Sequence, residues 1–213
     1  MSNKRSLARR TATAAVASAA AALVLAACGG NGSAGHGAHN GATASATPSA
    51  PASAPAAQGQ HNAADVAFAK GMIPHHRQAV VMADLAATRA ESAEVKKLAA
   101  DIKKAQDPEI KTLSGWLASW GEQVPAEGAS DHSAHGMAGM MSAQEMDRLK
   151  NASGKAFDTA FAELMIKHHE GAVEMAGTER TEGSFPAAKT MAEAIITSQS
   201  AEIAQMNKLL GRS

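Results

Sequence analysis

Aromatic side chains and surplus charge are both scarce in this sequence. Its 213 residues include no Tyr, two Trp and four Phe, and 20 Lys and Arg are balanced by 20 Asp and Glu. Proteins that bind nucleic acids carry basic patches or stripes, and the sequence has no such stripe. The composition therefore argues against DNA or RNA as a partner.

Cysteine is almost absent, and several catalytic signatures are missing altogether. The one cysteine, Cys28, follows a short apolar run near the N-terminus. The chain has no phosphate-cradling Gly-rich motif, no Cys-x-x-Cys-His haem motif and no Ser-His-Asp order, which argues against nucleotide-binding, cytochrome and hydrolase functions. If Cys28 is modified, no thiol is left for disulfides or for thiolate metal sites.

The first 27 residues have the pattern of an export signal. A basic start is followed by small and apolar residues at 11–27, a run too short and Ala-rich for a good membrane-spanning helix. The basic residues are Lys4, Arg5, Arg9 and Arg10. The run ends in Leu25-Ala26-Ala27-Cys28, where Cys28 takes the place of the modified residue of a lipobox. We therefore predict an extracytoplasmic lipoprotein anchored to the cell membrane through Cys28; the alternative is an ordinary signal peptide with a chance cysteine.

The segment after the cysteine, residues 28–61, is predicted to be a disordered tether. It consists almost entirely of Gly, Ala, Ser, Thr, Pro, Asn, Gln and His, and such a segment buries too little apolar surface to fold. Ordered structure is expected from about residue 62, so that 62–213 forms one domain with a single core. Without residues 1–27 the chain has 16 basic and 20 acidic residues, a net charge of −4.

An internal repeat organises this domain. When the chain is shifted by 93 residues, 65–117 aligns with 158–210 without a gap and 20 of 53 positions are identical. The agreement is strongest between DVAFAKGMIPHHRQAVVMA, residues 65–83, and DTAFAELMIKHHEGAVEMA, residues 158–176, where 12 of 19 positions match. The matches include His, Met, Phe, Gln and Glu in one register, so the domain contains a duplicated unit.

Each unit is expected to form an antiparallel helical hairpin. Apolar residues recur at three- and four-residue spacing over 64–88 and 93–119 in the first unit, and over 156–179 and 186–210 in the second. Ser92 and Ser184 are the predicted N-caps of the second helices. Pro74 and Pro108 predict kinks or local breaks. The fold class is therefore all-α, a four-helix bundle made of two hairpins.

A long crossover joins the two hairpins. The connector, residues 121–154, is rich in Gly, His and Met, and a capping-box sequence from Ser142 to Glu145 predicts a short helix that ends near Asn151. Asp65 and Asp158 are expected in the first turns of their helices, where the helix dipole favours acidic residues.

Polar and sulfur-bearing side chains share the inward stripes of the helices. At 100° per residue, one arc of the first helix of each unit carries a His pair and two Met; these residues are His75, His76, Met72 and Met82 in one unit and His168, His169, Met165 and Met175 in the other. The facing helices carry Gln106, Glu109, Gln199 and Glu202 at the level of the His pairs. Burying so many polar groups costs free energy unless they are paired.

Two explanations of this interior remain open. It is either a satisfied hydrogen-bond network that specifies the bundle, or a metal site in which the His and Met residues are ligands and the Glu and Gln residues support or join them. Imidazole suits copper, zinc and iron, whereas thioether sulfur is soft and selects Cu(I). The inward carboxylates are too few for a typical di-iron or di-manganese bundle. The donor set favours copper, as Cu(I) or Cu(II), over zinc or iron.

A second cluster of the same donors lies in the connector. Two His and three Met fall within eleven Gly- and Ala-rich residues, namely His132, His135, Met137, Met140 and Met141. No helical period buries them, and Met in a mobile loop has little use in packing. We interpret the cluster as a loop that captures a soft ion.

The motif Leu164-Met165-Ile166-Lys167-His168-His169-Glu170-Gly171-Ala172-Val173-Glu174-Met175-Ala176, with Gly139-Met140-Met141-Ser142 upstream, resembles the bacterial family catalogued as domain of unknown function 305. The resemblance covers about 64–210, and its first copy departs at Gly71 and Pro74. It implies a ferritin-like four-helix fold and, from some members, copper binding outside the cytoplasm.

The sequence thus predicts a copper-binding lipoprotein, not an enzyme, that sequesters or buffers copper through His and Met ligands. A dinuclear redox enzyme in which Glu109 and Glu202 bridge two metal ions is the first alternative. A metal-free structural or interaction module is the second. The oligomeric state is not predicted.

Overall fold

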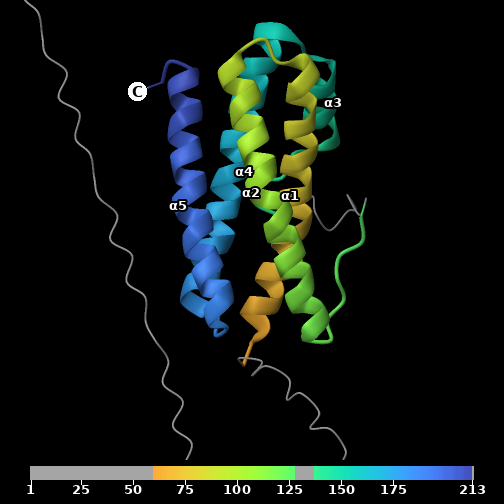
Figure 1. Ribbon diagram of the computed structural model, residues 1–213, viewed down its shortest axis with the longest axis vertical. Coiled ribbons are helices and arrows are strands. Elements are labelled where there is room, and N and C mark those ends of the chain that lie inside the picture. Colours follow the sequence, from red (N-terminus) through yellow and green to blue (C-terminus); the bar gives the residue numbers. More distant parts are fainter. Residues whose placement is uncertain (1–59, 128–136, 213) are drawn as a thin grey trace, which may run out of the picture. The chain divides into compact units, whose positions relative to one another are not determined.

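A computed structural model describes residues 60–127 and 137–212, and all regular secondary structure in these residues is helical (Figure 1). The helices are α1 (Ala63–Arg89), α2 (Ala93–Ser119), α3 (Ala143–Asn151), α4 (Gly154–Glu182) and α5 (Pro186–Leu209). The predicted signal peptide, Cys28 and most of the tether lie outside the described residues. No helix in the described ranges has the length and apolar character needed to cross a bilayer.

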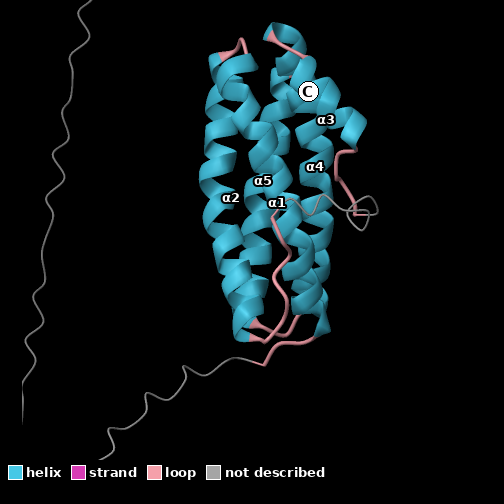
Figure 2. Cartoon of the chain, turned by 90° about the vertical axis from the view of Figure 1, so that its right-hand side faces the viewer, coloured by secondary structure: helices cyan, strands magenta, loops and turns pink. Residues whose placement is uncertain are grey.

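The four long helices form the two predicted hairpins. Residues 90–92 join α1 to α2 and residues 183–185 join α4 to α5, so each pair must run antiparallel. The hairpins pack against each other mainly through α1 and α4, and the long helices run side by side (Figure 2). The all-α prediction is confirmed for the described residues. Each hairpin is one copy of the repeat, and the helices that carry the His motif, α1 and α4, make the main contact between the hairpins.

Helix starts follow the predicted caps in two of three cases. The Ser92 hydroxyl accepts hydrogen bonds from the backbone N–H groups of Glu94 and Val95. Ser142 and Glu145 form the predicted capping box at the start of α3. The prediction for Ser184 is wrong, because α5 begins at Pro186 with Phe185 in the N-cap position.

Ser184 does not cap α5 because its side chain has another partner. Its hydroxyl donates to Asp65 Oδ2 at 3.1 Å, and Asp65 also accepts from the backbone N–H of Phe185 at 2.9 Å. The α4–α5 turn is therefore held by a carboxylate from α1. Asp158 does the same for the other turn, accepting from the backbone N–H groups of Glu91 at 3.1 Å and Ser92 at 2.9 Å.

Asp65 lies in the first turn of α1 as predicted, but the first-turn prediction for Asp158 is wrong. Helix α4 starts at Gly154, earlier than the predicted residue 156, and this leaves Asp158 in the second turn. The two prolines do not break their helices, since α1 continues through Pro74 and α2 through Pro108.

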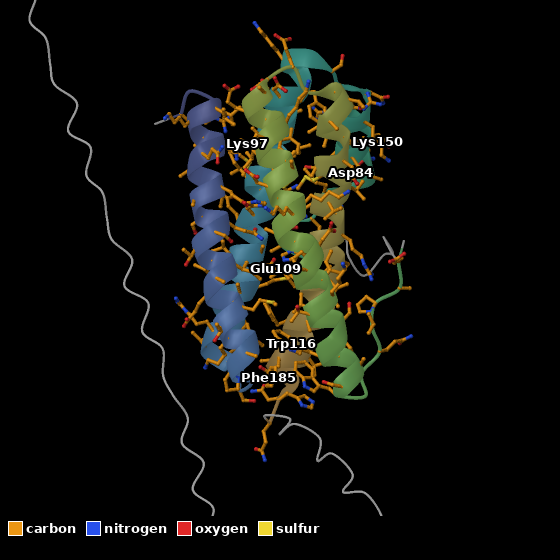
Figure 3. The ribbon with its side chains drawn as sticks, in the orientation of Figure 1. Asp84, Lys97, Glu109, Trp116, Lys150 and Phe185 are labelled. Carbon is orange, nitrogen blue, oxygen red and sulfur yellow. The ribbon has the colours of Figure 1, made fainter. Side chains whose placement is uncertain are left out.

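The apolar core consists of two clusters. The first contains Met82, Leu98, Phe157 and Met165, and the second contains Met72, Ile73, Leu113 and Ile195. Phe185 packs edge to face against Trp116 and Trp120, with ring centroids 5.4 Å apart in each pair. Figure 3 shows Trp116 and Phe185 near the end of the bundle where α1 begins.

Candidate metal centre

The two halves of the protein meet at a pair of histidines. His75 on α1 and His168 on α4 face each other with ring centroids 3.7 Å apart and an interplanar angle of 42°. Both side chains are fully buried, with 0% relative exposure. They meet because each lies on the inward stripe of its helix, and α1 packs directly against α4. The contact therefore joins one copy of the repeat to the other.

The ring nitrogens of this pair lack partners. Nδ1 and Nε2 of His75, and the same two atoms of His168, are buried without a hydrogen bond to any described residue. A buried polar group left in this state costs about 1–3 kcal/mol. A closed hydrogen-bond network, the first explanation left open by the sequence, would have satisfied these four atoms. In a neutral ring one of the two nitrogens carries a lone pair, and that nitrogen is free to act as a ligand.

The neighbouring histidines have a different arrangement. His76 Nε2 donates to Glu109 Oε2 at 2.7 Å, and His169 Nε2 donates to Glu202 Oε2 at 2.6 Å. An ionised carboxylate only accepts, so this contact places a proton on Nε2, and in the neutral ring Nδ1 then carries the lone pair. Both Nδ1 atoms are buried with no partner in the described ranges. Each glutamate therefore fixes the orientation of one of these rings, and a histidine held by a carboxylate in this way is common in metal sites.

The two glutamines and two glutamates of the facing helices lie close to the predicted level. Gln106 and Gln199 are buried, and neither Oε1 finds a donor in the described part of the chain. Glu109 and Glu202 are partly exposed, with 22% and 18% of their side chains accessible. Figure 3 shows Glu109 midway along α2. Each carboxylate contacts one imidazole from its own hairpin.

Burial also determines the charge state of His75 and His168. Desolvation, with smaller contributions from the nearby His76 and His169, lowers the pKa of His75 to about 3. The carbonyl of Ala138 opposes this shift, although it does not form a hydrogen bond of normal geometry with the ring. Burial, followed by the charges of His75 and His169, lowers the pKa of His168 well below its usual value. Both rings are therefore neutral near pH 7, which is the form that binds metals.

The predicted sulfur ligands divide into two groups. Met72, Met82 and Met165 are fully buried in the apolar clusters. Met175, Met137 and Met140 are half-buried. Met141 is 5% exposed and packs in the first apolar cluster, so the prediction that the connector methionines have little use in packing is wrong for Met141. His132 and His135 of the predicted capture loop lie outside the described residues. The four residues of the second group lie around the α1–α4 contact, where the connector crosses it.

Three residues that sequence reasoning missed hold the connector on the site. Gln78 donates from Nε2 to the carbonyl of Met141 at 3.0 Å and accepts from its N–H at 2.7 Å. Gly139 has φ +79°, and a Cβ there would come within 2.8 Å of the carbonyl oxygen of His168. A Cβ on Gly171 would clash with the backbone of Ala138. Residues 137–141 therefore pack directly against the histidine pair.

Carboxylates and imidazoles alone do not complete a site in the described structure. Within residues 60–127 and 137–212, no three His, Cys, Asp or Glu side chains are grouped so as to hold one ion. Two imidazoles do meet, and the sulfurs of Met137 and Met175 lie beside Gly71, one helical turn before His75 on α1. The donor set that the geometry offers is therefore nitrogen and thioether sulfur.

Residues 65–210 match the family described as Domain of unknown function (DUF305). This protein belongs to the DUF305 family. The match covers both copies of the repeat and the connector between them. No curated protein matches the chain significantly.

Solved structures of DUF305 proteins have the same fold. A putative secreted DUF305 protein from Streptomyces coelicolor is 33% identical over 73% of this chain and 93% of its own, with a TM-score of 0.63. CopM in its Cu(II)-bound form is 40% identical over 68% of this chain and 94% of its own, with a TM-score of 0.60. CopM in its Cu(I)-bound form is 37% identical over the same shares, with a TM-score of 0.58. CopM is also known in a silver-bound form.

Proposed function

We propose that this DUF305 protein is an extracytoplasmic, membrane-anchored copper-binding lipoprotein that sequesters or buffers copper. The observation that carries this proposal is the contact between His75 and His168, whose four ring nitrogens are buried without partners in the described structure. Copper would give one nitrogen of each ring the bond that it lacks. The similarity to CopM, which has been crystallised with Cu(I) and Cu(II), supports the same ion.

The donor chemistry favours copper over zinc or iron. Neutral imidazoles are good ligands for copper, and thioethers favour its reduced form. Iron and manganese bundles rely instead on several carboxylates that bridge two ions. Glu109 and Glu202 each accept a hydrogen bond from a histidine, which suits an orienting role better than a bridging one. We therefore place binding, not redox catalysis, first.

Substituting the central pair tests the proposal. The double variant His75→Ala, His168→Ala should lose copper binding in an equilibrium titration of the purified protein, because both halves of the site lose their imidazole. Adding His76→Ala and His169→Ala should abolish any remainder. Circular dichroism shows whether the helices of each variant still form.

His61→Ala is the matched control. His61 is exposed and stacks on Trp120 with ring centroids 4.5 Å apart, at the end of the bundle where α1 begins. Its loss should leave copper binding unchanged. A folded double variant that binds copper as tightly as the wild type would refute the proposed site.

Membrane anchoring through Cys28 is tested separately. In the native host, the wild-type protein should partition into detergent with the membrane fraction, and mass spectrometry should find a lipid on Cys28. Cys28→Ser should prevent the modification, because serine has no thiol to acylate. If the variant fractionates like the wild type and no lipid is found, the lipoprotein assignment is wrong while the metal site is unaffected.

A further inference from the structure

Residues 137–141 of the connector, which we call the strap, cover the histidine pair with a thin layer of backbone. Ala138 is exposed to solvent, yet its carbonyl lies close to the ring of the fully buried His75. The N–H of Met140 donates to the carbonyl of Met137 at 3.3 Å, so the chain makes a tight turn at this point. Solvent and the His75 ring are therefore separated here by the thickness of one peptide segment.

The strap is seated on both halves of the protein. On α1, Gln78 donates from Nε2 to the carbonyl of Met141 at 3.0 Å and accepts from its N–H at 2.7 Å. On α4, a side chain on Gly171 would collide with the carbonyl of Ala138, so glycine lets the strap approach the helix. Gln78 and Gly171 are equivalent positions of the repeat, each three residues after the central histidine of its helix. The strap therefore crosses the α1–α4 contact about one helical turn from the histidine pair.

Lifting the strap disturbs less of the structure than separating the helices would. The backbone of Met141 is bound by a side chain, and segments attached in this way open at lower free energy than a packed core. Separating α1 from α4 would instead expose the apolar clusters, in which Met72, Phe161 and Met165 are fully buried. Opening of the strap is therefore the easier route from solvent to the buried rings.

We propose that Gln78 is a positioning residue that controls how fast copper enters and leaves the histidine pair, because it holds the strap through the backbone of Met141. The inference rests on the proposed copper-binding function and adds kinetic control of that site. An amide suits the role, since it both donates and accepts and so binds the two backbone groups of one residue. The strap closes over the site with or without copper, so loosening it speeds entry and exit alike.

The exit of Cu(I) into an excess of a coloured chelator measures this control. The rate is taken where it no longer depends on chelator concentration, and equilibrium competition with the same chelator gives the affinity. Gln78→Leu keeps nearly the same volume but cannot bind the backbone of Met141. Exit should become about tenfold faster with affinity changed less than about threefold, as expected when two hydrogen bonds of ordinary net strength are lost from the closed strap.

A conservative variant grades the effect. Gln78→Glu keeps the acceptor for the N–H of Met141 and loses the donor for its carbonyl. Its exit rate should lie between those of the wild type and Gln78→Leu. Because the charge of glutamate stays at the surface of the bundle, this variant also tests the inference if Gln78→Leu does not fold.

Gly171→Ala tests the strap from the other helix. The added methyl group would push the carbonyl of Ala138 away from α4 and leaves Gln78 and all histidines unchanged, so Cu(I) should again leave faster. Hydrogen exchange at the amide of Met141, followed by NMR in the metal-free protein, shows directly whether the strap is loosened. Exchange should be faster in Gly171→Ala and in Gln78→Leu than in the wild type.

Asp84→Asn is the matched control. Asp84 is exposed on the same helix as Gln78, and it pairs with Lys103 on α2 at 2.5 Å instead of with the connector. Weakening this contact should leave Cu(I) exit and the exchange of the Met141 amide as they are in the wild type.

The outcomes separate this inference from the proposed function. If the Met141 amide exchanges faster in Gln78→Leu and Cu(I) still leaves at the wild-type rate, the strap does not limit exchange, and the inference is wrong while copper binding stands. If exit is faster only in proportion to a loss of affinity, Gln78 merely stabilises the loaded site, and the inference is again wrong. Equal acceleration in Asp84→Asn would also overturn it. If the wild type binds no copper, the proposed function itself is wrong.

Discussion

At the scale of single residues, the hydrogen bonds from His76 to Glu109 and from His169 to Glu202 decide which ring nitrogen is free. Each carboxylate accepts from Nε2 at 2.7 Å or less. The negative charge also makes the imidazole a better donor to a metal ion. We therefore expect Glu109 and Glu202 to be positioning residues that act on copper binding through the imidazole rings. Their effect on copper affinity should be measurable in variants that still fold.

The double variant Glu109→Gln, Glu202→Gln tests this role. An amide keeps the shape of the carboxylate but has no charge, and its N–H groups can reverse the tautomer of the ring. Copper affinity should fall by about 10–100-fold, as for other groups that support metal ligands. Glu163→Gln is the control, because Glu163 is exposed and its carboxylate pairs with Arg212 at 2.5 Å instead of with a histidine. Equal affinity in all three proteins would contradict the positioning role.

Four of the seven positions at which the two motif copies differ carry contacts to the connector. The residues at these positions that contact residues between 122 and 145 are Lys70, Arg77, Lys167, and the equivalent pair Gln78 and Gly171. The sequence showed the differences, but the path of the connector depends on tertiary contacts that no helical period encodes. Differences between repeats were therefore the available signal for Gln78 and Gly171.

At the scale of the elements, carboxylates from one hairpin hold the turn of the other. Asp65 binds the α4–α5 turn, and Glu179 from α4 faces it with 1% exposure. Burial, together with the contact and the negative charge of Asp65, raises the pKa of Glu179 to about 8, against a smaller opposing effect of Lys189 on α5. Neither carboxyl oxygen of Glu179 has a hydrogen-bond partner among the described residues. Two ionised carboxylates repel each other and only accept, so burial beside Asp65 favours the protonated form of Glu179.

This contact predicts a pH dependence of stability. The unfolded chain loses this proton near pH 4.5 and the folded protein near pH 8, so the folded state binds more protons between these values. Stability from this group is therefore complete below about pH 4.5 and is lost as the pH rises toward 8. Glu179→Gln removes the titration and keeps a donor for Asp65.

Thermal melts from pH 5 to pH 8 measure the effect. The difference in melting temperature between Glu179→Gln and the wild type should grow with pH in favour of the variant, by about 5 °C for a domain of this size. Comparing the two proteins at each pH cancels contributions from other groups, including the histidines. A constant difference across the range would show that Glu179 is not a buried acid.

Helices were the easiest elements to predict, because their apolar spacing is local. The sequence placed all four long helices and the capping box of α3 correctly, with ends that differ from the structure by a few residues at most. It failed at Ser184, where a long-range partner, Asp65, replaced local capping. Local sequence patterns predict where a helix begins unless a residue from another element makes a stronger contact with the capping residue.

At the scale of the whole molecule, duplication explains the site. Two hairpins of the same sequence pattern pack through α1 and α4, so that a histidine from each copy meets its equivalent. The repeat and the inward arcs predicted that the His pairs are buried. They did not predict which of the four rings touch, because that depends on how the hairpins slide and rotate against each other.

The central claim is that one metal ion is held jointly by the two halves of the protein. A crystal structure of the copper-loaded protein, with anomalous scattering measured at the copper edge, tests it most directly. We expect a copper peak bonded to one ring nitrogen of His75 and one of His168. Copper found only at surface residues or at the connector, with both rings still unligated, would contradict the account.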